Sequence, residues 1–94
     1  MSSTDAHSVT VRLPGIFVDL FPGAPRALPL VAATVGDMID QLDKGFPGLG
    51  PMLRDERPAI REHINIFVAG ERAELSTPLV PGEEVFILTA ISGG

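Results

Sequence analysis

The chain has 94 residues, and a hydrophobic content of 45% supports one small domain with a packed core. It lacks cysteine, which excludes disulfides and thiolate metal sites, and its net charge of −5 with seven basic residues argues against nucleic acid and anionic membranes as partners. No apolar run approaches the roughly 20 residues of a membrane span, and residues 1–7 lack the order of a secretion signal, so we expect a cytoplasmic protein.

The first third of the chain predicts a hairpin with a long connection. Residues 1–7 are expected to form a flexible tail. Apolar and polar residues alternate over 9–13, which is typical of a half-buried strand, and a Pro-Gly pair ends it. Residues 16–25 are expected to form a loop that places aromatic side chains in the core. A second strand is predicted over 26–32.

One amphipathic helix is predicted next. Thr34 is typical of an N-cap, and apolar residues at spacings of three and four follow it as far as Phe46. Asp40 and Lys44 lie off the apolar stripe at a spacing that favours an ion pair. Residues 48–58 are rich in proline and glycine, so we expect a loop there with at most one helical turn.

The second half of the chain predicts three more strands. Alternation predicts a strand over 64–68, a short edge strand over 72–75 and a long strand over 84–90. The order β-β-α-β-β-β predicts an α+β fold, in which one main helix packs on one face of a mixed sheet of four to five strands. The last strand should lie at the centre, parallel to the first. The domain is expected to span 8–90, before a flexible tail over 91–94.

Four short segments resemble the ubiquitin-like sulfur carriers in their order and spacing. They are Thr34-Val35-Gly36-Asp37, Ile64-Asn65-Ile66-Phe67-Val68, Pro81-Gly82-Glu83-Glu84-Val85 and Gly93-Gly94. That family includes the small subunit of molybdopterin synthase, the thiamin-pathway carrier and a carrier for cysteine synthesis. The resemblance implies the β-grasp fold. The length of segment 46–62 is closer to the molybdopterin and cysteine-pathway members.

The resemblance also implies a function for the last residues. An E1-like activating enzyme would adenylate the Gly94 carboxylate with ATP, and a sulfur donor would convert it to a thiocarboxylate for a sulfur-acceptor synthase. Gly93, Ser92 and Ile91 would enter the partner's active site, where glycine permits a narrow channel. The chain would be a substrate rather than an enzyme, and it would bind no cofactor itself.

Two other functions use the same sequence features. A ubiquitin-like modifier would be conjugated to other proteins through Gly94, and a plain interaction module would not need the glycines. Within the carrier interpretation, the sulfur could serve cysteine, molybdopterin or a specialised metabolite. We expect no metal site, because His7 and His63 are far apart and have no carboxylates at ligand spacing.

Strand alternation predicts a partner-binding surface. If Val85 and Ile87 point to the core, then Phe86 and Leu88 must point to the opposite face of the sheet, and Phe67 with them. One helix leaves that face open, and an exposed apolar patch commonly marks an interaction site. The alternative is that residues 16–25 or 46–62 cover these side chains.

Overall fold

The computed structural model describes residues 8–57 and 59–89, and the predicted tails over 1–7 and 91–94 lie outside the described residues. Five strands and three helices form an α+β fold within the described part. In chain order these are β1 (Ser8–Arg12), α1 (Gly15–Leu20), β2 (Ala27–Val31), α2 (Val35–Gly45), α3 (Leu49–Leu53), β3 (Ile64–Val68), β4 (Glu71–Arg72) and β5 (Glu84–Thr89). None of the described helices has the length and apolar character needed to cross a membrane.

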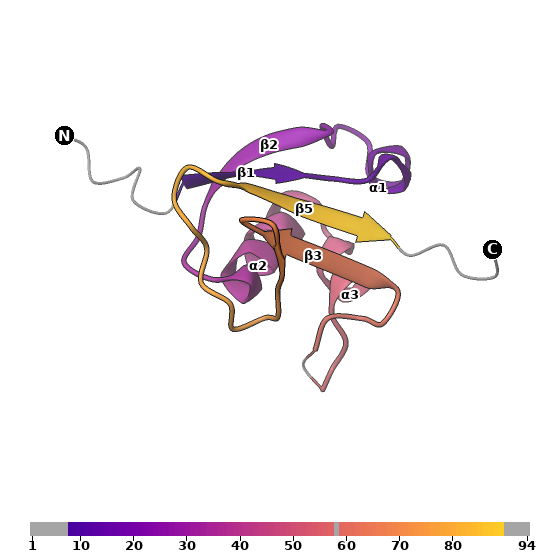
Figure 1. Cartoon of the computed structure of the whole chain (residues 1–94). Coiled ribbons are helices and arrows are strands. Elements are labelled where there is room, and N and C mark those ends of the chain that lie inside the picture. Colours follow the sequence, from indigo (N-terminus) through magenta and orange to yellow (C-terminus); the bar gives the residue numbers. More distant parts are fainter. Residues whose placement is uncertain (1–7, 58, 90–94) are drawn as a thin grey trace.

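The sheet is mixed, and β5 lies at its centre as the sequence predicts. The strand order is β2-β1-β5-β3-β4 (Figure 1). β5 runs parallel to β1, with Arg12 aligned with Phe86, and antiparallel to β3, with Phe67 opposite Phe86. The last strand therefore joins the first hairpin to the second half of the sheet.

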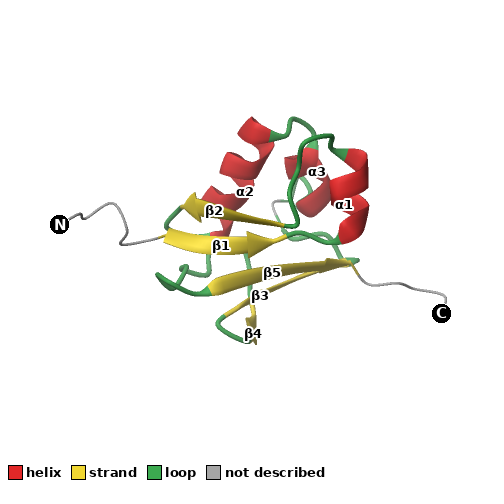
Figure 2. Cartoon of the chain, turned by 90° about the horizontal axis from the view of Figure 1, so that it is seen from above, coloured by secondary structure: helices red, strands yellow, loops and turns green. Residues whose placement is uncertain are grey.

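The helices cover one face of the sheet and leave the other open. Figure 2 shows α2 and α3 on one side of the sheet, with α1 at the end where β5 finishes. The apolar stripe of α2 packs with the inward side chains of the strands. Its buried members are Val35, Met38, Ile39 and Leu42, and those of β3 and β5 are Ile64, Ile66, Val68, Val85 and Ile87. Full burial of one such side chain contributes about 1.5–3 kcal/mol, which holds the strands in this register.

α2 begins as predicted, but the predicted ion pair between Asp40 and Lys44 is wrong. The Thr34 hydroxyl accepts a hydrogen bond from the Asp37 amide at 3.2 Å, as an N-cap does. Asp40 pairs with Arg54, which follows α3, instead of with Lys44. Helix α3 packs against α2 and brings this guanidinium to the helix surface, a contact that spacing along α2 could not reveal.

The predicted loop over 16–25 is wrong at its start, where the chain forms α1. No side-chain cap begins this helix, and six residues are too few for a stable isolated helix. The side chain of Phe17 is only 2% exposed and packs into the core. Tertiary burial of one aromatic side chain thus stabilises a turn that the local sequence does not specify.

β4 is shorter than predicted, because the chain leaves the sheet to reach α2. A strand is predicted over 72–75, but only Glu71–Arg72 forms β4 beside β3. The carbonyls of Leu75 and Thr77 instead accept hydrogen bonds from the first two amides of α2, at 2.9 and 3.0 Å. Such amides have no partner inside their own helix, so the segment after β4 completes the start of α2.

The Asp43 carboxylate joins α2 to α3, and we predict that its removal destabilises the fold. Its Oδ1 accepts hydrogen bonds from the amides of Gly48 and Gly50, both at 3.0 Å. Asp43→Ala leaves these amides without an acceptor and should lower the free energy of unfolding by about 1–3 kcal/mol. Asp43→Asn keeps an oxygen in place and should lower it less. Urea denaturation measures both, and equal losses would show that the charge matters rather than the oxygen.

Candidate functional site

The central strand carries the chain toward the predicted reactive residues. Thr89, the last described residue, is aligned with Ile64 at the start of β3. The predicted site residues follow within five positions and lie outside the described residues. They are Ile91, Ser92, Gly93 and Gly94. Because β5 is paired with β1 as far as Phe86 and with β3 as far as Thr89, the sheet fixes the point from which these residues continue.

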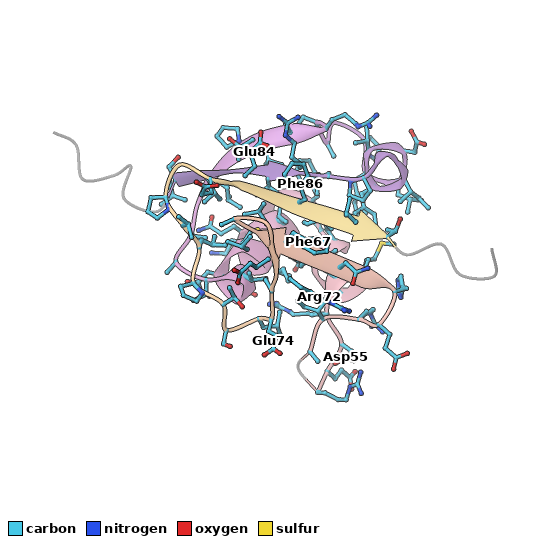
Figure 3. All side chains as sticks on the ribbon, in the orientation of Figure 1. Asp55, Phe67, Arg72, Glu74, Glu84 and Phe86 are labelled. Atoms are coloured by element: carbon cyan, nitrogen blue, oxygen red, sulfur yellow. The ribbon has the colours of Figure 1, made fainter. Side chains whose placement is uncertain are left out.

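The open face of the sheet carries the predicted apolar side chains. Phe86 and Leu88 are 40% and 45% exposed, whereas Val85 and Ile87 are buried. Phe67 lies opposite Phe86 on β3 and is half-buried (Figure 3). The alternative in which a loop covers this face is therefore wrong for Phe86 and Leu88. These side chains form an apolar patch of the kind that binds proteins.

Two arginines flank the Phe67–Phe86 pair. Arg12 is aligned with Phe86 on β1, and Arg72 is opposite Phe67 on β4. The Arg12 side chain donates to Glu84 at 3.1 Å from Nε and at 2.6 Å from Nη2. Both side chains are nearly half exposed, so this ion pair contributes at most about 1 kcal/mol. Strand register brings these arginines to the patch, so they could not be identified from the sequence alone.

A second exposed apolar pair lies on α1. Ile16 and Leu20 are 53% and 52% exposed, and their spacing of four places them on one face of the helix. This pair was not predicted from the sequence, because a loop was expected over these residues. The four-residue spacing after Pro14 was the available signal, but a single such pair is too short to establish a helix.

The described residues offer a partner surface and a groove. None of them belongs to a group of three or more His, Cys, Asp or Glu side chains that could hold a metal ion, and none of the buried ones is polar or charged. A groove of about 890 Å³ lies beside β3 and β4, lined by residues that include Ile60, Arg61, Arg72 and Leu75. The described part of the chain can thus present a partner surface near Thr89, from which the sequence continues to Gly93 and Gly94.

Among the carboxyl groups of residues 8–57 and 59–89, that of Asp55 has a strongly shifted pKa, and it lies in the loop after α3, away from the patch (Figure 3). The Arg57 side chain donates to Asp55 and, with the amides of Arg57 and Ala59, lowers the pKa of Asp55 from 3.8 to about 2. The folded loop therefore stabilises the ionised form of Asp55.

This pKa shift predicts how stability changes with pH. A carboxyl group whose pKa is lower in the folded state stabilises the fold above its unfolded pKa, and this stabilisation is lost as the pH falls toward the folded pKa. Asp55 should therefore contribute above about pH 4 and lose its contribution between pH 4 and 2. Asp55→Asn keeps an oxygen for the two amides but cannot ionise. The melting temperature of the variant should fall less steeply than that of the wild type across this range, and parallel curves would contradict the assignment.

Comparison with known proteins identifies the family. The ThiS family matches residues 13–94. Small archaeal modifier protein 1 of Haloferax volcanii is 34% identical over 62 residues, which cover 66% of this chain and 71% of that protein. Sulfur carrier protein CysO of Mycobacterium tuberculosis is 29% identical over 93 residues, which cover 93% and 99%.

The fold comparison agrees with the sequence comparison. The crystal structure of the BexX/CysO complex from Amycolatopsis orientalis contains a chain that superimposes with a TM-score of 0.81 at 28% identity, covering 92% of this chain and 99% of that one. The central parallel strand and the helices on one face are the β-grasp arrangement that the resemblance implied. The predicted fold and family are thus confirmed, and the chain belongs to the ThiS family of ubiquitin-like sulfur carriers.

Proposed function

We propose that this chain is a sulfur carrier whose Gly94 carboxylate is adenylated and then converted to a thiocarboxylate. The observation that carries the proposal is the Gly93-Gly94 pair, five residues or fewer beyond the central strand, in a chain that matches the ThiS family as far as residue 94. Glycine lets a backbone enter a channel that side chains would block. The ordered sheet would position this segment for another protein's active site.

The proposed chemistry explains why activation is required. A carboxylate is a poor electrophile, so one of its oxygens would first attack the α-phosphorus of ATP, releasing pyrophosphate and forming an acyl adenylate. A sulfur nucleophile would then attack the carbonyl carbon, forming a C–S bond and breaking the C–O bond to AMP. The thiocarboxylate sulfur would be the nucleophile passed to the acceptor. The chain has no cysteine that could carry sulfur instead.

The proposal gives the chain two classes of protein partner. An E1-like activating enzyme would bind ATP and adenylate Gly94, and a sulfur-acceptor synthase would use the thiocarboxylate in the cytoplasm. The patch of Phe67, Phe86 and Leu88 would contact one or both of them. The complex of CysO with BexX supports a partner-bound state of a related protein.

A protein-modifier role is the second candidate. It is favoured by the 34% identity to small archaeal modifier protein 1. Both roles need an activated Gly94, and they differ in the final acceptor. A modifier would form an isopeptide bond with a lysine of another protein, whereas a carrier would exchange oxygen for sulfur at its own carboxylate.

Intact-mass measurement tests the proposal. The purified chain would be incubated with the activating enzyme, ATP and sulfide. We expect the mass increase of one sulfur-for-oxygen exchange, which requires ATP. Mass spectrometry of cell extracts would separate the two candidates, because isopeptide-linked adducts of the chain favour the modifier. A chain that gains no sulfur under these conditions and forms no adducts would contradict both.

A further inference from the structure

The exposed apolar side chains are unevenly distributed over the described residues. Six large ones are exposed, namely Ile16, Leu20, Val31, Val80, Phe86 and Leu88. Phe86 and Leu88 lie on β5. Val31 is aligned with Ser8 at the start of β1, and Val80 lies close to it, because the Gly82 amide donates to the Ser8 carbonyl at 2.7 Å. These two valines are therefore at the opposite end of the sheet from Thr89.

Helix α1 lies at the same end of the sheet as Thr89. β1 and β5 run in parallel, with Arg12 aligned with Phe86. Three residues beyond this pair, the first segment reaches Gly15, where α1 begins, and the second reaches Thr89, where β5 ends. Figures 1 and 2 both show α1 beside the end of β5. The exposed pair of Ile16 and Leu20 therefore lies at the same end of the sheet as Thr89, from which the sequence continues to Gly93 and Gly94.

The length of the connecting segment limits where an enzyme that acts on Gly94 can sit. Five residues follow Thr89 up to Gly94, and five fully extended residues span at most about 18 Å. α1 has six residues and is about 9 Å long. An active site that holds the Gly94 carbonyl carbon would therefore lie within about 18 Å of Thr89, at the end of the sheet where α1 lies, and we expect the enzyme surface around that site to reach α1.

We propose that Ile16 and Leu20 form a docking surface for the ATP-dependent enzyme that adenylates Gly94, at the end of the sheet where β5 finishes (Figures 1 and 2). This inference rests on the proposed function. The two side chains are more than half exposed, and Phe17 packs the opposite side of the helix into the core, so the surface is available to a partner. The enzyme would present apolar side chains to it, since burial of apolar surface drives such contacts.

A charge-neutral double variant tests the docking surface. Ile16→Glu with Leu20→Lys removes both apolar side chains and leaves the net charge at −5. It also suits the helix, because glutamate is favourable in the first turn, lysine in the last turn, and the pair at a spacing of four is stabilising. The matched control is Val31→Glu with Val80→Lys, which removes two exposed apolar side chains at the opposite end of the sheet.

The readout is steady-state pyrophosphate release by the enzyme that adenylates the wild-type chain, with sulfide present so that the acyl adenylate is consumed and AMP is released. We expect the KM of the α1 variant to rise about tenfold, the effect of losing one well-packed contact cluster, while kcat and the melting temperature stay the same. The control should keep the wild-type KM. If the double variant melts at a lower temperature, the single variants Ile16→Glu and Leu20→Lys replace it.

Two outcomes would overturn the inference, and they differ from failure of the proposed function. An unchanged KM for the α1 variant would show that the enzyme does not contact α1. An equal rise in the KM of the control would show that the loss of any two exposed apolar side chains raises KM, wherever they lie. If the wild-type chain itself is not adenylated, the proposed function fails, and the docking surface that rests on it is rejected as well.

Discussion

Deletion of Gly94 should abolish thiocarboxylate formation and leave the melting temperature unchanged. The proposed reaction takes place at the Gly94 carbonyl carbon, and the deletion moves the carboxylate one residue back, out of reach of the bound ATP. A misplacement of about 1 Å can already cost a hundredfold in rate. The buried core lies within residues 9–87, so stability should not depend on Gly94. Intact mass after incubation with the activating enzyme, ATP and sulfide measures the first effect, and thermal melting the second.

Gly93→Val tests whether a side chain near the end of the chain blocks activation when the position of the carboxylate is unchanged. It keeps the carboxylate at its full distance from Thr89 but adds a β-branched side chain, which restricts the backbone and would obstruct a narrow channel. We expect this variant to be activated poorly and to melt like the wild type. Unaltered sulfur incorporation in the Gly94 deletion would place the reactive carbon elsewhere and reject the carrier assignment.

The elements with strong local signals were predicted correctly from the sequence. The N-cap Thr34 and the apolar stripe after it define α2, and strict alternation defines β3 and β5. The central position of β5 followed from the order of the elements. In each case several residues in one segment repeat the same signal, so that the local sequence and the tertiary packing agree.

The errors arise where contacts distant in sequence decide the structure. α1 depends on the burial of Phe17, and β4 ends early because Leu75 and Thr77 bind the first amides of α2. Asp40 finds Arg54 across the α2–α3 contact. None of these partners can be identified from spacing within a single segment.

The same distinction applies to the candidate site. The exposure of Phe86 and Leu88 followed from alternation within one strand, which is a local property. The arginines beside the patch and the apolar pair on α1 depend on strand register and on tertiary packing. A surface assembled from several elements is therefore only partly visible in the sequence, even when its central strand is predicted correctly.

Adjacent substitutions in β5 should have opposite effects, because Val85 and Phe86 point to opposite faces of the sheet. Val85 is fully buried, and Val85→Asp would place an unpaired charge among apolar side chains. We expect a loss of about 4 kcal/mol or more, a large part of the roughly 5–15 kcal/mol that stabilises a typical domain. The variant should melt at a much lower temperature than the wild type, as measured by circular dichroism, and a domain near the lower end of this range would retain little stability.

Phe86→Asp should instead fold and lose partner binding. Phe86 is 40% exposed and lies on the open face, where the carboxylate stays hydrated, so we expect a loss of only about 1 kcal/mol. Its aromatic ring belongs to the exposed apolar patch, and its removal should weaken binding to the activating enzyme or the acceptor, measured by titration calorimetry. Arg12 and Arg72 lie on the strands to either side of the Phe67–Phe86 pair and would tolerate the new charge. A folded Val85→Asp together with an unfolded Phe86→Asp would show that the strand faces the other way and that the patch is not a partner surface.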